Sequence, residues 1–236
     1  MGILRSRPGL GPCTRRAVFL GALLTGLSAS AWAQVHGQAA ANAQPPNGPG
    51  NAVFRPPADG RMVYRGFTIH AATILSSPQY AAVMASMPHQ IDIVMDCGLR
   101  PEVIRFLQAQ TIVVRPGLHG QFGRFNPRNP GVSIEDAVAA PQKPIVLHEL
   151  LHAYHWHVIP GGFHNPEIMT FFDRARNLRR YPEGAYLMKN VQEFFAVTAS
   201  LYLWGHIDRP PHSREGLKAA QPNYYKWLGD FFGVQK

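Results

Sequence analysis

Five consecutive residues in the second half of the chain, His148-Glu149-Leu150-Leu151-His152, constrain the fold more than any other feature. Apolar residues stand before the first histidine and between the two histidines, so a helix here is largely buried. Pro144 suits the first turn of a helix, and Pro160-Gly161-Gly162 predicts its end, which gives a helix from Pro144 to about Val158. The fold must therefore bury this helix and still provide polar partners for two imidazoles and a carboxylate.

Two histidines four residues apart lie on one face of a helix, about one turn apart. His148 and His152 can therefore bind one metal ion, and Glu149, at the edge of that face, can hold a metal-bound water. Zinc suits such a site because it lowers the pKa of a bound water toward neutrality, where the glutamate can accept its proton. The alternative is a pair of core histidines whose nitrogens bond to backbone carbonyls. The buried surroundings favour the metal site.

A third protein ligand is expected from a helix predicted at Asn190–Trp204. Glu193 is the only charged residue from Val191 to Trp204, and a lone carboxylate on an apolar helix is costly to bury unless it is paired or binds a metal. A narrow exposed face or a pairing with an arginine is the alternative. Another zinc pattern, with a third histidine six residues after the second, fails because Val158 stands at that position.

The His148–His152 motif, the segment Glu193-Phe194-Phe195-Ala196 and Tyr186 seven residues before Glu193 together resemble the gluzincin metallopeptidases. Within that group the pattern is most similar to the catalytic domain of anthrax lethal factor and its relatives. The resemblance covers about residues 144–204. It implies a zincin-like fold, in which a small twisted sheet packs on the metal helix and a second helix supplies the glutamate.

By this resemblance, His148, His152 and Glu193 bind one zinc ion, Glu149 is the general base, and Tyr186 stabilises the oxyanion. For Tyr186 the alternative is a packing aromatic with its hydroxyl at the surface. The sequence departs from the thermolysin branch, where an aspartate four residues after the ligand glutamate orients the first histidine. Val197 stands there in this chain, so that partner must come from elsewhere.

The rest of the pattern predicts an α+β domain with a mainly helical C-terminal half, because strand-like segments come first and helical segments follow. Strands are expected at 62–70, 91–95 and 111–115, and an edge strand at 121–125 within a glycine- and proline-rich loop at 117–131. Helices are expected at 78–87, 101–109, 166–178 and 223–232, in addition to the two that carry the motif.

Residues 1–33 have the composition of a secretory signal peptide. Four arginines and no acidic residue accompany an apolar stretch at 17–27, and Ala31-Trp32-Ala33 matches a cleavage site. The segment Thr14–Leu20 also resembles a twin-arginine signal, with Val18 where that pattern prefers phenylalanine, so the twin-arginine and general routes both stay open. We therefore expect an exported protein, periplasmic or secreted, without stable membrane insertion once the signal is removed.

Residues 34–60 predict a flexible linker, because they are rich in Ala, Gln, Asn, Pro and Gly and hold few large apolar side chains. Residues 61–236 are then the catalytic domain. Four of the 23 basic residues and none of the 14 acidic ones lie in the predicted signal, which leaves a net charge of +5. This mild charge, without a basic stripe interleaved with aromatics, gives no reason to expect nucleic-acid binding.

One cysteine, Cys97, remains after the predicted signal, so no internal disulfide is expected. We interpret Cys97 as a small buried hydrophobe, with a nucleophilic role as the alternative. Three other histidines lie near the motif. His155 is expected at the surface, with a place in the cleft as the alternative, while His157 and His164 have no required role.

The predicted function is that of an exported zinc metallopeptidase, which hydrolyses peptide bonds of a peptide or protein substrate with a zinc-activated water and Glu149 as the base. The rival hypothesis is a catalytically silent periplasmic protein that binds zinc or a partner on the same scaffold. An intact Glu149 argues against this rival, because a protein that only binds has no need of a base.

Overall fold

The computed structural model describes residues 54–128 and 131–236. The predicted signal peptide at 1–33 and residues 34–53 of the predicted linker lie outside the described residues. In the two described ranges, no helix combines the length and the hydropathy that a membrane span requires.

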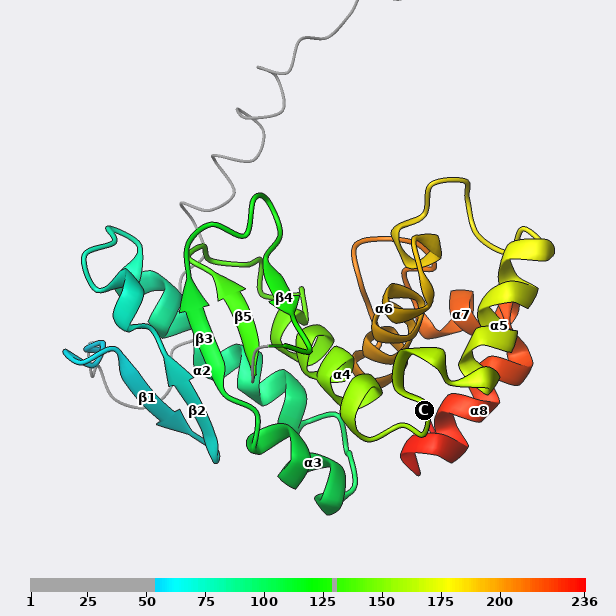
Figure 1. Ribbon diagram of the computed structural model, residues 1–236, viewed down its shortest axis with the longest axis horizontal. Helices are drawn as coiled ribbons and strands as arrows, with labels where there is room; N and C mark the ends of the chain where they lie inside the picture. The colour runs from blue at the N-terminus through cyan, green and yellow to red at the C-terminus, as the bar shows by residue number, and fades with distance from the viewer. Residues whose placement is uncertain (1–53, 129–130) are drawn as a thin grey trace, which may run out of the picture. The chain divides into compact units, whose positions relative to one another are not determined.

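A five-stranded mixed sheet forms the first half of the described chain, in the order β1-β2-β3-β5-β4 (Figure 1). Its strands are β1 (Arg61–Tyr64), β2 (Phe67–His70), β3 (Ile112–Arg115), β4 (Gly123–Phe125) and β5 (Val132–Glu135). The pairs β2–β3 and β3–β5 are parallel, whereas β1–β2 and β4–β5 are antiparallel. Every second residue of β2, β3 and β5 is buried, so one face of the sheet packs on the core. β4 forms an edge of the sheet, as predicted.

The single strand predicted at 62–70 is wrong, because the chain reverses there and forms the β1–β2 hairpin. The reversal uses Arg65 and Gly66, which have φ angles of 47° and 83°. Two successive residues with positive φ twist a two-residue hairpin loop in the sense that suits the flanking strands. The apolar residues on either side conceal this turn, because their weak alternation fits one long strand equally well.

The strand predicted at 91–95 is also wrong, since these residues continue the helix that was expected to end at 87. Helix α2 runs from Tyr80 to Met95 with Pro88 inside it. Met84, Met87, Ile91 and Val94 are all buried, so the apolar run belongs to the buried face of a helix. A short apolar segment does not by itself distinguish a buried helix from a buried strand. With α3 (Pro101–Gln108), α2 forms the crossover between the parallel strands β2 and β3.

The second half is helical, as predicted. Its helices are α4 (Ile145–His157), α5 (Pro166–Asn177), α6 (Val191–Trp204), α7 (Arg214–Ala220) and α8 (Pro222–Phe232). Short 3-10 segments are η1 (Ala72–Ile74), η2 (Gly162–His164) and η3 (Tyr186–Met188). Strand β5 and helix α7 were not predicted.

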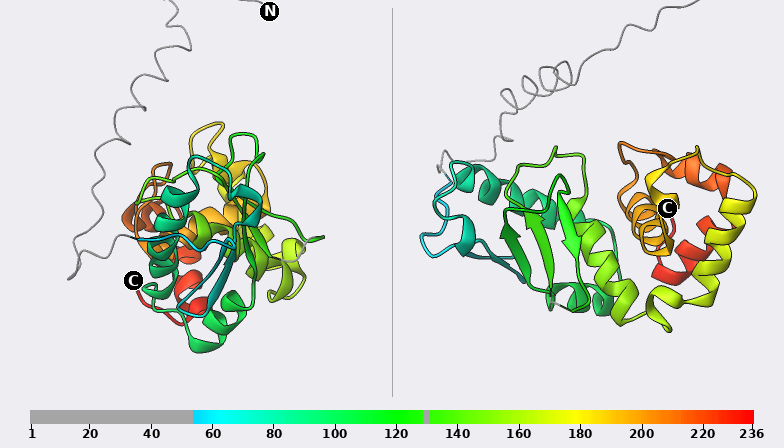
Figure 2. Two further views of the ribbon diagram at one scale, coloured as in Figure 1. Left: turned by 90° about the vertical axis from the view of Figure 1, so that its left-hand side faces the viewer. Right: turned by 45° about the horizontal axis from the view of Figure 1, so that its top comes forward.

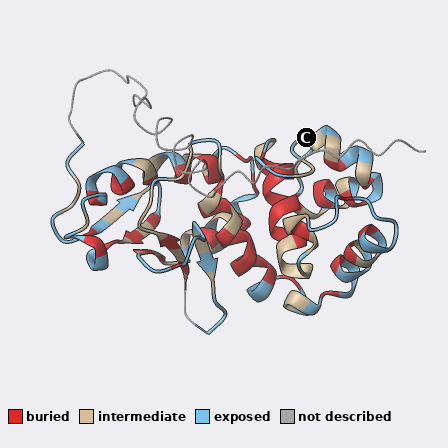
Figure 3. Ribbon diagram, turned by 90° about the horizontal axis from the view of Figure 1, so that it is seen from above, coloured by how far each residue is buried: buried red, intermediate tan, exposed pale blue. Residues whose placement is uncertain are grey.

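Helix α4 lies between the sheet and the helices of the second half (Figure 1 and Figure 2). It packs against α2, β4 and β5 on one side and against α6 on the other. Buried residues gather along α4 and α6, while the outer helices and loops carry most of the exposed residues (Figure 3). The prediction of an α+β domain, with a small sheet packed on the helix that carries the motif, is confirmed.

Candidate metal centre

The start of α4 is fixed by a side chain from α2. The first N–H groups of a helix have no partner within it, and α4 has no side-chain cap of its own. Buried Gln90 supplies one: its Oε1 accepts from the Val146 N–H at 3.2 Å, while its Nε2 donates to the Lys143 carbonyl at 2.8 Å. These two hydrogen bonds of the Gln90 amide fix the position of the first turn of α4, and with it the positions of His148 and His152.

Helix α6 places Glu193 in its first turn. Asn190 caps the helix, and its side chain accepts a hydrogen bond from the Glu193 N–H at 2.8 Å. The N-terminal end of a helix favours a negative charge, so a carboxylate is stable at this position. Residues 194–203 are buried throughout, which sets the helix firmly against α4. The carboxylate is thereby held toward the two histidines.

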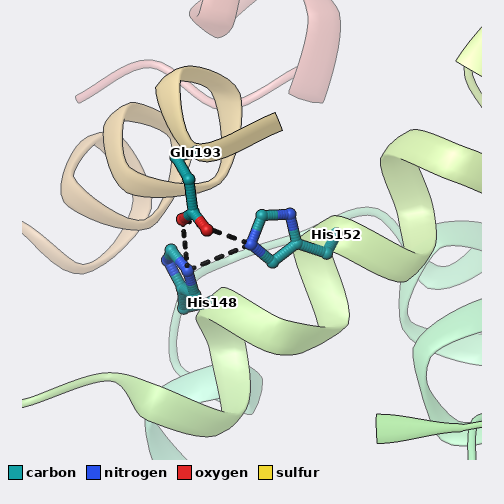
Figure 4. Close-up of side chains that lie close together, drawn as sticks. All are labelled: His148, His152 and Glu193. Carbon is teal, nitrogen blue, oxygen red and sulfur yellow. Dashed lines mark hydrogen bonds and ion pairs between the residues drawn. The ribbon is translucent and has the colours of Figure 1, made fainter. Parts of the chain in front are cut away.

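The three predicted metal ligands meet between α4 and α6 (Figure 4). The Nε2 atoms of His148 and His152 are 3.1 Å apart, and they lie 3.3 Å and 3.5 Å from Oε2 of Glu193. Around a tetrahedral zinc ion with bonds of about 2.0–2.2 Å, neighbouring ligand atoms are about 3.3–3.6 Å apart. The three donor atoms, at 3.1–3.5 Å from one another, are close to the spacing of one face of such a tetrahedron, and three protein ligands are the usual number in catalytic zinc sites.

The polar atoms of this cluster also need a cation. Oε2 of Glu193 is buried, and its neighbours among the described residues are the two imidazole nitrogens, neither of which gives it a hydrogen bond of good geometry. Burial works against ionisation of Glu193, but the two imidazoles outweigh it and hold the pKa of this carboxyl well below its usual range. An ionised carboxylate facing two imidazole nitrogens is a donor set that fits zinc. The role of the three residues as zinc ligands stays a prediction.

Glu149 lies beside the cluster and not within it. Its side chain is buried, and burial raises its pKa to about 7, against the lowering effect of nearby His152. A carboxyl group with a pKa near neutrality can accept a proton and return it. Glu149 also lines both of the pockets that open next to the metal ligands. This is the position that the sequence predicts for a general base.

The edge strand β4 restricts the space available to Glu149. Its first residue, Gly123, lies so close that an added Cβ would stand 2.5 Å from Cγ and 2.6 Å from Oε1 of Glu149. The loop that leads to β4 is held at its start by Glu135, which accepts from the N–H groups of Gly117 and Leu118. Nothing in the sequence indicates this contact, because glycine is common in loops for conformational reasons alone.

Gly123→Ala is therefore expected to move the Glu149 side chain without unfolding the protein. The backbone of Gly123 does not need a positive φ, and the clashing atoms belong to the far part of a flexible side chain. We expect a loss of peptide hydrolysis of roughly ten- to a hundredfold with zinc content unchanged. Steady-state kinetics and metal analysis of the variant test this. Wild-type kcat in Gly123→Ala would show that this contact does not position Glu149.

Tyr186 lies in the 3-10 segment η3, ahead of α6, and contributes to both pockets beside the metal ligands. Burial and the nearby Glu193 carboxylate raise the pKa of its hydroxyl well above the usual value, so it remains a neutral donor at physiological pH. The short segment between η3 and Asn190 brings the ring back over the site. The structure thus places Tyr186 next to the predicted ligands, and its part in catalysis stays a prediction.

The expectation that His155 lies at the surface is wrong. The residue is fully buried, and neither ring nitrogen has a hydrogen-bond partner among the described residues. Its ring packs against Phe195 of α6 and Phe163 of η2, with centroid distances of 4.6 Å and 5.1 Å. The segment after α4 folds back and covers this face, which helical periodicity alone did not reveal. Burial lowers the pKa of His155 to about 3.

Buried His155 is expected to make folding sensitive to acid. Its pKa rises from about 3 in the folded chain toward 6.5 on unfolding, so protons favour the unfolded state. Protonation of His155 does not reduce the free energy of unfolding above pH 6.5. As the pH decreases from 6.5 to 3, it lowers this free energy by several kcal/mol in order of magnitude. Urea unfolding of metal-free wild type and His155→Leu across this range measures the effect. The variant should show the shallower decline, and parallel curves would contradict the assignment.

The other predicted residues are placed as follows. Cys97 is buried and its pKa is raised to about 12 by burial, so the prediction of a buried hydrophobe is confirmed. His157 and His164 are exposed and lie outside the cluster. Sequence reasoning missed the basic residues Lys143 and Arg209, which line the pocket beside Glu149. Arg209 follows the motif helices at a distance along the chain that no spacing rule connects to them.

Comparisons with known proteins add little to this picture. No protein-family model matches the chain, and no curated protein matches it. Among solved structures, the fold is similar to the PRO-PRO endopeptidase from Paenibacillus alvei, with 18% sequence identity and a TM-score of 0.46. The match covers 64% of this chain and 91% of that one. A similarity at this level establishes neither a common family nor a common activity.

Proposed function

We propose that this chain is an exported zinc-dependent metallopeptidase. The observation that carries the proposal is the convergence of His148, His152 and Glu193 at tetrahedral spacing, with Glu149 beside them at a pocket. A purely structural zinc site usually has four protein ligands, whereas three ligands and an adjacent base are typical of hydrolytic sites. Export rests on the composition of residues 1–33 alone. The finer likeness to anthrax lethal factor remains a prediction.

In the proposed mechanism, His148, His152 and Glu193 hold one zinc ion. Zinc, when bound, acidifies a coordinated water and polarises a carbonyl group. The Glu149 carboxylate accepts a proton from the attacking water and afterwards donates it to the amine that leaves. A divalent cation nearby favours the ionised form of Glu149, which is the form that accepts the proton. Tyr186 donates a hydrogen bond from its hydroxyl to the carbonyl oxygen as negative charge develops there.

Tyr186→Phe tests the last of these roles. The change removes the hydroxyl and keeps the ring, so folding and zinc content should not change. A donor that acts only on developing charge affects turnover more than substrate binding. We expect kcat to fall by roughly ten- to a thousandfold with KM nearly unchanged. Tyr181→Phe, at a buried hydroxyl that pairs with Gln221, is the control. An unchanged kcat would return Tyr186 to a packing role.

The function itself is tested with a mixed peptide library and the protein without its first 33 residues. We expect cleavage that stops when a chelator removes the metal and returns when zinc is added. Mass spectrometry of the products identifies the cleaved bonds. Stoichiometric zinc binding without cleavage of any library peptide would favour the rival, a silent zinc-binding or interaction protein. If the protein neither binds zinc nor cleaves a peptide, both the peptidase function and the rival are ruled out.

A further inference from the structure

The pocket next to Glu149 has walls of different chemistry. It has a volume of about 230 Å³, which accommodates a side chain or two. His148, Glu149 and Tyr186 form the wall toward the metal ligands. Lys143, Asp208 and Arg209 belong to the same lining, and Arg209 lies against Tyr186. A group bound in this pocket would therefore be adjacent to the reacting atoms and also within reach of two cations.

The two cations of the pocket differ in how closely they are paired with Asp208. Nζ of Lys143 and Oδ2 of Asp208 form an ion pair at 2.7 Å, and Nε of Arg209 is 3.7 Å from Oδ1. Burial alone would raise the pKa of Asp208. The hydrogen bond and charge of Lys143 and the charge of Arg209 outweigh burial, so the pKa of Asp208 is lowered below its usual value. Asp208 is thus ionised and balances one of the two cations. Glu149 is a second acidic group of the same lining, so the position that favours an anionic group is the guanidinium of Arg209, which has no carboxylate of the described residues nearer than Asp208 at 3.7 Å.

The guanidinium of Arg209 stacks on the ring of Tyr186, although the Arg209 side chain is exposed. Its carbon lies 4.6 Å above the centre of the Tyr186 ring, and its terminal nitrogens form no hydrogen bond with the described residues. A guanidinium stacked on an aromatic ring keeps its edge free for two parallel hydrogen bonds to a carboxylate. The distance to Asp208 is too long for a strong bond, so that edge is not already occupied.

The turn that carries Arg209 is anchored on both sides. The Ile207 N–H donates to the His212 carbonyl at 3.0 Å, and the Ile207 side chain is buried. The Arg214 guanidinium donates to the carbonyls of Tyr202 and Leu203, at the end of α6. These bonds connect the turn to the same helix that carries Glu193. The backbone that carries Arg209 is therefore fixed in advance, which reduces the ordering that a ligand would have to impose.

We propose that this pocket is a carboxylate subsite, in which Arg209 with Lys143 recognises a carboxylate of the substrate close to the scissile bond. The proposal rests on the proposed peptidase function and names its substrate class, namely acidic peptides. The carboxylate can come from an Asp or Glu side chain or from the free C-terminus of a short peptide. Both sources present the same planar group to the guanidinium, and a peptide with lysine at that position is disfavoured.

Two measurements test the subsite. The first compares kcat/KM for matched peptides with Glu, Gln or Lys placed in turn on each side of the cleaved bond, with free or amidated C-termini. We expect a roughly ten- to hundredfold preference for the carboxylate at one position, the scale of a charge-assisted bidentate pair. The position at which the preference occurs shows whether the bound carboxylate comes from a side chain or from the free C-terminus of the peptide. The second measures binding of the same fluorescent peptides to metal-free protein by anisotropy, which does not depend on turnover.

Arg209→Gln should reduce the preference to about one in both measurements, and Arg209→Lys should retain part of it, because the charge stays while the fork is lost. Arg174→Gln, which removes one charge from the exposed face of α5, is the matched control and should keep the full preference. Equal kcat/KM for Glu and Gln peptides, or an unchanged preference in Arg209→Gln, would overturn the subsite and leave the peptidase function standing. If no peptide is cleaved, the peptidase function fails, and the binding measurement alone decides whether the subsite exists.

Discussion

Zinc-loaded protein with the change Glu149→Gln is expected to lose peptide hydrolysis by about a hundredfold or more while it keeps its metal and its fold. Glutamine has the shape of glutamate and fits the same space beside Gly123, but its amide cannot accept a proton from water. Glu149 makes no contact that the metal cluster requires, so binding and chemistry separate in this variant. Progress curves with a cleaved library peptide, together with zinc analysis of the same sample, give the result.

The matched control is Glu167→Gln, the same chemical change at an exposed site in the first turn of α5. It should retain the wild-type rate. Wild-type turnover in metal-loaded Glu149→Gln would remove this mechanism and leave the buried carboxyl without a role. A loss of zinc in this variant would instead show that Glu149 belongs to the metal site.

The second large effect is expected from the ligands themselves. His152→Ala should lose nearly all zinc and all activity, and Glu193→Ala should bind zinc much more weakly, because each change removes one of only three protein donors. Elemental analysis after gel filtration measures the bound metal, and the shift of Tm on addition of zinc measures it independently, since a ligand of the folded state stabilises it.

His157→Ala is the control for these variants, because His157 lies on the same helix but is exposed and outside the cluster. It should bind one zinc ion per chain, as the wild type does. One zinc per chain in both His152→Ala and Glu193→Ala would show that the ligand assignment is wrong, even if the protein remains active.

The sequence was most informative where two constraints applied to the same residues. The helix that carries His148 and His152 was predicted almost to the residue, because its apolar face, Pro144 and the glycines after it all agree. Glu193 was found because a single charge on an otherwise apolar helix has few structural explanations. The structure then brings the three side chains together from positions about 40 residues apart, which spacing within one helix could not establish.

The sequence was misleading where local pattern and tertiary packing differ. The β1–β2 hairpin has no strong turn signal, because Arg65 adopts a positive φ that arginine rarely favours. The C-terminal part of α2 looks like a strand because every residue of a short apolar run can be buried in either state. His155 was expected outside, since nothing in the sequence shows that Phe163 and Phe195 close over it. Arg209 and Gly123 belong to the site only through contacts between distant segments.

The division of the predicted ligands between α4 and α6 has a consequence for the whole domain. A bound ion would act as a crosslink between a helix packed on the sheet and a helix of the C-terminal half, closing a loop of about 40 residues that contains α5. Because the three ligands come together only in the folded chain, the binding free energy of the ion would add to the stability of the folded state. The one cysteine of the described residues, Cys97, cannot form a disulfide within them. Metal supply in the compartment where the protein folds would then govern how long the folded chain survives proteolysis.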